Sequence, residues 1–175
     1  MPGERRSRAV AVLGSAVFLV VAPGTIAGYV PWTMTRWRTQ PALLGLAPLR
    51  LVGVVLIAIG LLGLLDSFRR FAVEGFGTPA PVLPPRILVV TGLYRFVRNP
   101  MYCGIISAVV GQALLFGSTG LLLYAAVIWL LFHLWVLGYE EPTLRASFGV
   151  QYDEFCANVP RWIPRAIPWR APRHR

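Results

Sequence analysis

Residues 101–139 read MYCGIISAVVGQALLFGSTGLLLYAAVIWLLFHLWVLGY and contain no formally charged side chain. One crossing of a bilayer takes about 20 apolar residues, so this stretch is long enough for two. A turn-forming sequence, Gly117-Ser118-Thr119-Gly120, divides it near the middle. We therefore expect two transmembrane helices, at about 100–116 and 120–139, joined as a tight antiparallel hairpin.

Two further apolar segments precede this pair, at about 9–30 and 49–65. The first follows a basic N-terminus, as a signal peptide does, but it is long enough to span a bilayer and lacks a small-x-small cleavage site. We expect it to be retained as a helix with a kink at Pro23-Gly24. The predicted fold is all-α, a single integral membrane domain over residues 1–175 with about four transmembrane helices.

The composition is typical of a membrane protein. Of the 175 residues, 56% are hydrophobic and 14% are charged, whereas soluble domains carry about 25% charged residues. The net charge of +10 comes from 17 arginines against seven acids. Because the arginines flank apolar segments, we expect membrane lipids as partners and not nucleic acid. Cys103 and Cys156 are isolated and show no metal-ligand spacing, so no metal site is expected.

The arginines also predict the orientation, because cytoplasmic segments of membrane proteins are enriched in them. With a cytoplasmic N-terminus, 14 arginines fall in cytoplasmic segments and three (Arg36, Arg38, Arg50) on the other side. We therefore expect both termini in the cytoplasm of a protein of the cell membrane. The segment before the hairpin and Glu140-Glu141 after it then lie on the same cytoplasmic side, where they can form one site.

The segment before the hairpin, TGLYRFVRNPMYCG at residues 91–104, concentrates polar and turn-forming residues. Asn99-Pro100 is a good helix start, and the free backbone N–H groups there suit an anionic ligand group. Tyr94 and Tyr102 are either interfacial belt residues or the lining of an aromatic pocket for an adenine ring or a sulfonium cation. Arg95 and Arg98 are positive-inside residues or ligand clamps.

Polar residues also mark the second helix of the hairpin. Acids at a helix C-terminus oppose the helix dipole, so Glu140-Glu141 is either merely solvated or positioned for a cationic ligand or for Arg95 or Arg98. His133 shares a helical face with Glu140 and is either a site residue or a neutral imidazole bonded to a neighbouring helix. Gln112 is expected to hydrogen-bond one helix to another.

Beyond the hairpin, residues 142–159 show the period of one amphipathic helix. Its apolar face contains Leu144, Phe148, Tyr152, Phe155 and Val159. This helix either lies on the membrane or closes a lid over the cytoplasmic mouth. The Pro-rich segment 67–90 either crosses that mouth or is a simple linker. The tail mixes Trp with Arg, as membrane-interface segments do.

Two motifs, TGLYRFVRNPMYCG at 91–104 and EEPTLRASFGVQYDEFCANVPRWIP at 140–164, resemble the isoprenylcysteine carboxyl methyltransferase and phospholipid methyltransferase superfamily. The resemblance covers about residues 86–164. It implies a membrane-embedded methyltransferase that uses S-adenosylmethionine in a cytoplasmic pocket and takes a lipid-like substrate from the bilayer. The cofactor contacts that it implies are Arg86, Ile87, Leu88, Val89, Tyr94, Asn99, Pro100, Met101, Tyr102 and Glu140, to which we add Arg98.

The chain departs from the family pattern at two positions. Many members have His where this chain has Asn99. The prenylcysteine enzymes carry an arginine four residues before the first Glu, where it contacts the substrate carboxylate, and here that residue is Val136. The second departure argues against a prenylcysteine carboxylate as the substrate and leaves cofactor binding unaffected.

The sequence thus favours methyl transfer from S-adenosylmethionine to a lipid-like or small amphiphilic acceptor. A carboxylate acceptor is already ionised, whereas an amine or phenol needs a base, for which Glu140, Glu141 and His133 are the candidates. One alternative is an NADPH-dependent membrane reductase, because Phe155-Cys156 and Val159-Pro160 resemble part of a C-terminal pattern of sterol reductases, but Glu140-Glu141 favours the methyltransferase. The other is a non-catalytic lipid-binding or scaffold protein.

Overall fold

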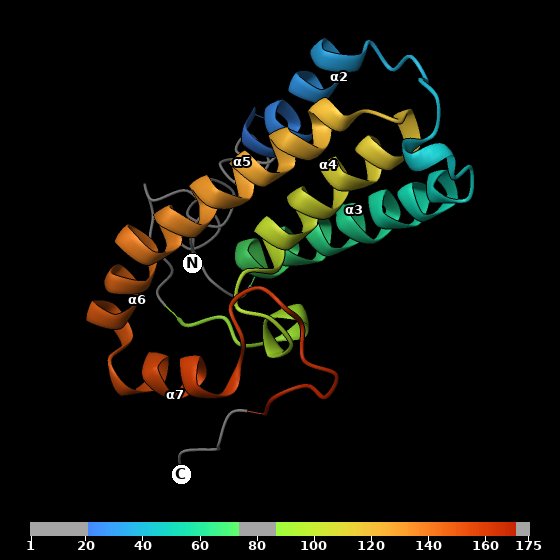
Figure 1. Cartoon of the computed structure of the whole chain (residues 1–175). Helices are drawn as coiled ribbons and strands as arrows, with labels where there is room; N and C mark the ends of the chain where they lie inside the picture. The colour runs from blue at the N-terminus through green and yellow to red at the C-terminus, as the bar shows by residue number, and fades with distance from the viewer. Residues whose placement is uncertain (1–20, 74–86, 171–175) are drawn as a thin grey trace, which may run out of the picture. The chain divides into compact units, whose positions relative to one another are not determined.

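The computed structural model describes residues 21–73 and 87–170, and within these ranges the chain is helical and contains no strand (Figure 1). The elements are η1 (Thr25–Tyr29), α2 (Val30–Thr35), η2 (Leu43–Gly45), α3 (Leu49–Val73), η3 (Gly92–Arg95), α4 (Pro100–Phe116), α5 (Thr119–Trp135), η4 (Val136–Glu140), α6 (Glu141–Phe148) and α7 (Val150–Asn158). The all-α prediction is confirmed for the described residues.

These elements fall into two compact units. The helical unit comprises the described residues up to 64 together with 101–134. The motif unit comprises the described residues of 65–100 and 135–170. Each unit has its own packing and is described separately below.

Two helical stretches are long and apolar enough to cross a membrane, Leu49–Arg70 with 22 residues and Thr119–Phe148 with 30. Helix α4 begins at Pro100 and ends at Phe116, as predicted, but its 17 residues make it a shorter apolar helix. At about 1.5 Å per residue it is about 26 Å long, slightly less than the apolar thickness of a bilayer.

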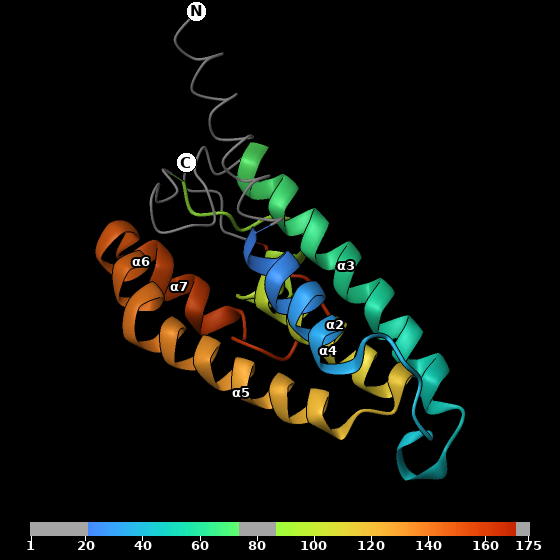
Figure 2. The same cartoon turned by 90° about the horizontal axis from the view of Figure 1, so that it is seen from above.

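Two predicted helix ends were wrong. The second apolar helix was expected to end near residue 65, but α3 continues to Val73. In this added part of the helix, Asp66 forms ion pairs with Arg69 and Arg70, one turn further along. The last apolar helix was expected to end near 139. Instead, the helix runs from α5 through the π-helical turn η4 into α6 (Figures 1 and 2).

The first predicted span, 9–30, lies partly outside the described residues. From residue 21 the chain is helical as far as Thr35, and it ends at Arg36 with a left-handed φ of 49°. Directly after Pro23-Gly24, where we predicted a kink, the helix widens into the π-helix η1. A π-helical turn shifts the hydrogen-bonding register and is a common cause of such irregularities.

In the helical unit, α3 and α4 pack backbone against backbone through glycines. A Cβ atom on Gly53 would lie 2.5 Å from the Gly111 carbonyl oxygen, and one on Gly60 would lie 2.6 Å from that of Gly104. Both glycine pairs are seven residues apart on their helices, which is the spacing that keeps two helices in contact over successive turns. The contact therefore leaves no room for side chains at these four positions.

Polar side chains connect the other helices of this unit. The Gln112 amide donates to the Ala27 carbonyl at 2.7 Å, and the Tyr124 hydroxyl donates to the Ile26 carbonyl at 3.0 Å. Both acceptors lie in η1, where the π-helical register alters the ordinary carbonyl pairing. The prediction that Gln112 bonds one helix to another is confirmed.

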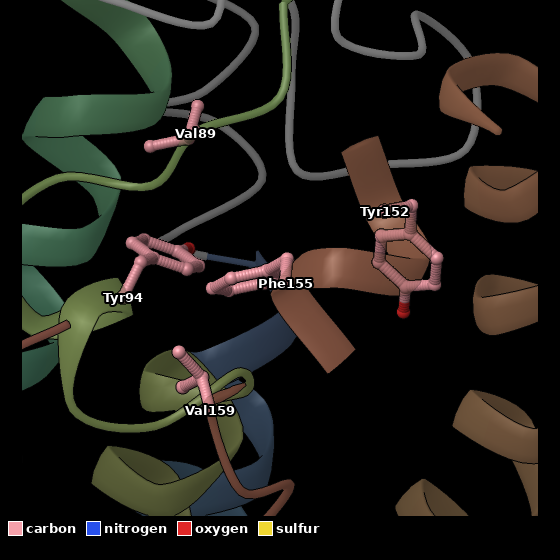
Figure 3. Close-up of a cluster of buried hydrophobic side chains, with 5 residues drawn as sticks. All are labelled: Val89, Tyr94, Tyr152, Phe155 and Val159. Atoms are coloured by element: carbon pink, nitrogen blue, oxygen red, sulfur yellow. The ribbon is translucent and has the colours of Figure 1, made fainter. Parts of the chain in front are cut away.

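In the motif unit, the predicted amphipathic helix 142–159 is two helices, α6 and α7. They are separated at Gly149, which has φ 52° and ψ −125°. A residue with a side chain rarely adopts that conformation, so the glycine reverses the chain where we expected a helix interior. After the break, the predicted apolar face is buried, and Tyr152, Phe155 and Val159 join Val89 and Tyr94 in the core shown in Figure 3. Before the break, Leu144 and Phe148 of α6 are partly buried and pack against this core.

Candidate functional site

In the motif unit, residues 87–99, which we call the motif loop, contact the end of α3 through Arg70. Gly92 has a φ of 53°, and the Arg70 guanidinium packs so closely against it that a Cβ atom would collide. The Arg70 side chain donates from Nε to Asp66 at 2.8 Å and from Nη1 to the Thr91 hydroxyl at 3.2 Å. This contact fixes the start of η3 and therefore the position of Tyr94.

Tyr94 is the buried aromatic residue of this loop. Its ring and that of Phe155 point toward each other in the core of the unit (Figure 3). Burial is the main cause that raises the pKa of the Tyr94 phenol far above its usual value, and the nearby negative charges of Glu140 and Asp66 raise it further. Tyr94 therefore stays a neutral phenol, and Glu140 lies close enough to influence it.

The second feature is a buried cluster of charges around Glu141. Glu141 Oε1 accepts hydrogen bonds from Arg161 Nε at 2.6 Å and from Arg98 Nη1 at 3.1 Å, and Oε2 accepts from Arg161 Nη2 at 3.1 Å. The Glu141 and Arg98 side chains are only 9% and 11% exposed. The hydrogen bond with Glu141 also raises the pKa of the Arg161 guanidinium. One carboxylate thus faces two guanidinium groups, and the cluster keeps an excess positive charge.

The Arg98 guanidinium makes one further contact, and one of its nitrogen donors is left without an acceptor among the described residues. Its Nη1 donates to the Cys156 sulfur at 2.8 Å. Its Nε is buried and has no hydrogen-bond acceptor among the described residues. A buried donor without an acceptor is costly, so this position favours the approach of an anionic group.

The C-terminal segment, residues 160–170, is bonded along the motif loop through its backbone. The N–H groups of Arg98, Arg165 and Trp169 donate to the carbonyls of Pro160, Phe96 and Arg95, at 2.9, 3.0 and 2.9 Å. The Arg95 side chain donates to the Trp169 carbonyl at 2.7 Å. Arg95 therefore holds this segment in place, a role that the sequence alone did not suggest.

Several predicted site residues meet in the motif unit. Tyr94, Arg98, Asn99 and Glu141 lie buried or nearly so, and Glu140 is half-buried. The Asn99 amide donates to the Arg161 carbonyl at 3.2 Å, so the residue before α4 is bonded to the C-terminal segment. Val89 belongs to the core and Leu88 packs against it, whereas Ile87 is 56% exposed. Arg86 lies outside the described residues.

Three other predicted residues belong to the helical unit. The Tyr102 ring stacks on Phe132 with centroids 4.5 Å apart, which brings the first turn of α4 beside the last turn of α5. The His133 ring stacks on Trp129 with centroids 5.2 Å apart. Met101 lies in the same unit. That these residues share a site with those of the motif unit stays a prediction.

Sequence reasoning missed Arg161, which makes the shortest contact to Glu141. The signal was present, because Arg161 follows Val159-Pro160 in the second motif. What the sequence lacks is the pairing itself, since residues 20 positions apart are brought together by the turn at Gly149 and by α7. The alternative that Glu140-Glu141 pairs with Arg98 is confirmed for Glu141.

A family model described as phospholipid methyltransferase matches residues 49–151, which include α3, the motif loop and the helices from α4 to α6. The match therefore covers more than half of the chain, including Tyr94, Arg98 and both glutamates.

Curated relatives show a similar likeness. The chain is 38% identical over 78 residues to protein-S-isoprenylcysteine O-methyltransferase A of Arabidopsis thaliana, covering 44% of this chain and 39% of that protein. It is 34% identical over 79 residues to protein-S-isoprenylcysteine O-methyltransferase of Schizosaccharomyces pombe, covering 45% and 33%. A probable enzyme of the same name from Oryza sativa subsp. indica is 33% identical over 120 residues, covering 65% and 60%.

The matched region thus spans between one third and three fifths of these relatives' lengths. No solved structure matches the chain significantly.

Proposed function

The chain belongs to the phospholipid methyltransferase family, and from this premise we propose that it transfers a methyl group from S-adenosylmethionine to a lipid-like acceptor at the cytoplasmic face of a membrane. The observation that carries the proposal is the meeting of Tyr94, Glu140 and the buried Arg98 in one unit. These groups come from the two motifs that flank the apolar hairpin sequence. Together they offer one anionic and one cationic side chain to a ligand that carries both charges.

The residues fit S-adenosylmethionine, which has a carboxylate, an amine and a sulfonium cation. The buried Nε of Arg98, which has no acceptor among the described residues, is suited to the carboxylate. Glu140 is a half-buried carboxylate near Tyr94 and is suited to the cationic part. When bound, the cofactor supplies an electrophilic methyl group. The protein's part is then to orient donor and acceptor in line and to exclude water.

We propose further contacts for the cofactor's adenosine and its surroundings. Backbone groups at the start of α4 provide N–H donors, because the first turn of a helix leaves them unpaired. The remaining proposed contacts are Arg86, Ile87, Leu88, Val89, Asn99, Pro100, Met101 and Tyr102.

Glu141 has a different role in this proposal. Its two carboxylate oxygens accept three hydrogen bonds from Arg98 and Arg161, so it is poorly placed to accept a proton from a substrate. We assign it as a positioning residue that orients Arg98. If the acceptor is an amine or phenol, Glu140 and His133 are the candidates for the base, whereas an ionised carboxylate needs none.

Our proposal for the acceptor class is based on family membership and on one departure from the family pattern. The curated relatives are named for O-methylation of isoprenylcysteine, a lipid-modified substrate. Here Val136, four residues before Glu140, is the first residue of η4 and is 1% exposed. It offers no cation for a substrate carboxylate, so we propose an amphiphilic acceptor that does not depend on a guanidinium at this position.

We propose the predicted topology as the setting of this reaction. Four transmembrane helices, with the last two as an antiparallel hairpin, place both termini and the motif unit on the cytoplasmic side of the cell membrane. The strong excess of arginines in the segments assigned to that side supports this orientation.

Radiolabelled methyl transfer tests the proposed function. The purified chain in lipid nanodiscs is incubated with methyl-labelled S-adenosylmethionine and either a total lipid extract, phosphatidylethanolamine or a farnesylated cysteine derivative. We expect label in a lipid of the extract, and little in the farnesylated cysteine. Heat-treated protein is the control. Absence of label from every acceptor would contradict the proposed activity, and label in the farnesylated cysteine alone would overturn the reading of Val136.

A further inference from the structure

The C-terminal segment exposes large apolar side chains on the outside of the motif unit. Ile163 is 79% exposed and Ile167 is 72% exposed. Pro164 and Ala166 between them are exposed as well. We call residues 163–167 the isoleucine loop. Two exposed isoleucines separated by one turn-forming sequence are unfavourable in water, and such a patch commonly marks an interaction surface.

The exposure is not the result of a loose chain end. Backbone hydrogen bonds hold the chain before the loop, within it and after it, at Pro160, Arg165 and Trp169. The Arg165 side chain also donates to the Asn158 carbonyl at 2.6 Å. The Trp169 ring packs on Phe155 of the core with centroids 5.8 Å apart. The isoleucine loop is therefore presented outward by a fixed scaffold.

Charge identifies the surface that the loop suits. Residues 160–175 contain five arginines and no acidic residue, and one of the five, Arg161, is paired with Glu141 inside the motif unit. Arg170, directly after Trp169, is exposed. Isoleucines beside arginines and tryptophans match the boundary of an anionic lipid leaflet, where apolar side chains enter the acyl region and guanidinium groups remain among the phosphates. A protein partner with a mixed surface would not require this one-sided charge.

We propose that the isoleucine loop inserts into the headgroup–acyl boundary of an anionic membrane leaflet, as an anchor for the motif unit additional to the transmembrane helices. Ile163 and Ile167 provide the apolar contact, and Arg170 contacts the lipid phosphates. The anchor depends on the lipid and not on a cofactor, so it stands independently of the proposed methyl transfer.

Depth-dependent quenching of a fluorescent label tests this proposal. Ile163→Cys is labelled with an environment-sensitive dye in full-length protein with Cys103→Ala and Cys156→Ser, the serine keeping an acceptor for Arg98. The protein is placed in nanodiscs of phosphatidylcholine with or without phosphatidylglycerol. Quenching by doxyl-labelled lipid and by aqueous iodide is then compared. Val150→Cys is the matched control, because Val150 is also apolar and 83% exposed but begins α7, at the far end of that helix from the loop.

We expect the label at 163 to be quenched by doxyl lipid and protected from iodide, more strongly with phosphatidylglycerol, and the label at 150 to show the reverse. Adding Arg170→Gln should lower the ratio of inserted to aqueous label about fivefold. Quenching by iodide alone at 163 would overturn the proposal. So would equal doxyl quenching at both positions, or protection from iodide without doxyl quenching, which would indicate a protein partner.

Discussion

The contacts inside the helical unit differ in kind from those inside the motif unit. In the helical unit, α3 and α4 meet through four glycines whose backbones are nearly in contact. In the motif unit, a buried carboxylate holds two arginines and the C-terminal segment is bonded along the motif loop. The first region depends on the absence of side-chain volume, and the second on the balance of charge.

This difference suggests that the two units have different functions. Close backbone packing, supported by the hydrogen bond from the Ser107 hydroxyl of α4 to the Leu56 carbonyl of α3, suits an environment of lipid, where there is no water to solvate a charge. Buried charges at fixed positions suit recognition of a charged ligand, because their orientation is set before the ligand arrives. The comparison predicts that the two units respond to different kinds of substitution.

The largest effect on stability is expected for Glu141→Gln. This change leaves the Arg98 and Arg161 charges without their carboxylate in a nearly buried site, and we expect a loss of about 3 kcal/mol in the free energy of unfolding. Denaturant titration in detergent micelles measures it. A loss below about 1 kcal/mol would show that water reaches the cluster and that its charges are not held as the contacts indicate.

Glu140→Gln is expected to affect the reaction and not the fold. If Glu140 contacts the cofactor or accepts a proton, methyl transfer should fall about 100-fold. The measurement is kcat/KM for labelled methyl transfer, with the unfolding midpoint as the control for folding. Full cofactor affinity together with full turnover would remove Glu140 from the site.

Gly60→Ala tests the uncharged contact between α3 and α4. The added methyl group would lie 2.6 Å from the Gly104 carbonyl oxygen, so we expect a loss of about 2 kcal/mol in unfolding free energy. Gly28→Ala is the matched control, because nothing lies within 4 Å of a Cβ atom at that position. Denaturant titration in micelles measures the difference. Equal unfolding free energies for the two variants would contradict a tight contact between α3 and α4 at Gly60.

The smallest effect is expected for Asp153→Asn. This residue pairs with Arg145 at 2.8 Å, but both side chains are more than half exposed, at 55% and 52%. Exposed ion pairs contribute about 0.5 kcal/mol or less, so its unfolding midpoint should barely change. Measured beside Glu141→Gln, it separates the effect of burial from the effect of removing an acid. A loss as large as that of Glu141→Gln would contradict this distinction.

Local signals in the sequence predicted much of the fold. Asn99-Pro100 and Gly117-Ser118 mark the two ends of α4 correctly, because proline and glycine act on their immediate neighbours. Gly149 was harder to interpret. The apolar face stays in phase across it, so periodicity alone does not show that the chain reverses there.

The site was predictable only in part. The motifs contain Tyr94, Arg98 and both glutamates, but no local pattern shows that Arg161 binds Glu141 or that Arg95 holds the Trp169 carbonyl. These contacts join residues distant in sequence and depend on how α6, α7 and the C-terminal segment fold back. The glycine contact of α3 with α4 was missed for the same reason, since each glycine taken alone is unremarkable within an apolar helix.

Equilibrium binding of labelled S-adenosylmethionine to the full chain in nanodiscs is the most direct test of the motif unit as a cofactor site. We expect saturable binding that S-adenosylhomocysteine displaces and NADPH does not, and weaker binding to Arg98→Gln and Glu140→Gln than to Asp153→Asn. No saturable binding to the unmodified chain, or displacement by NADPH, would contradict the assignment.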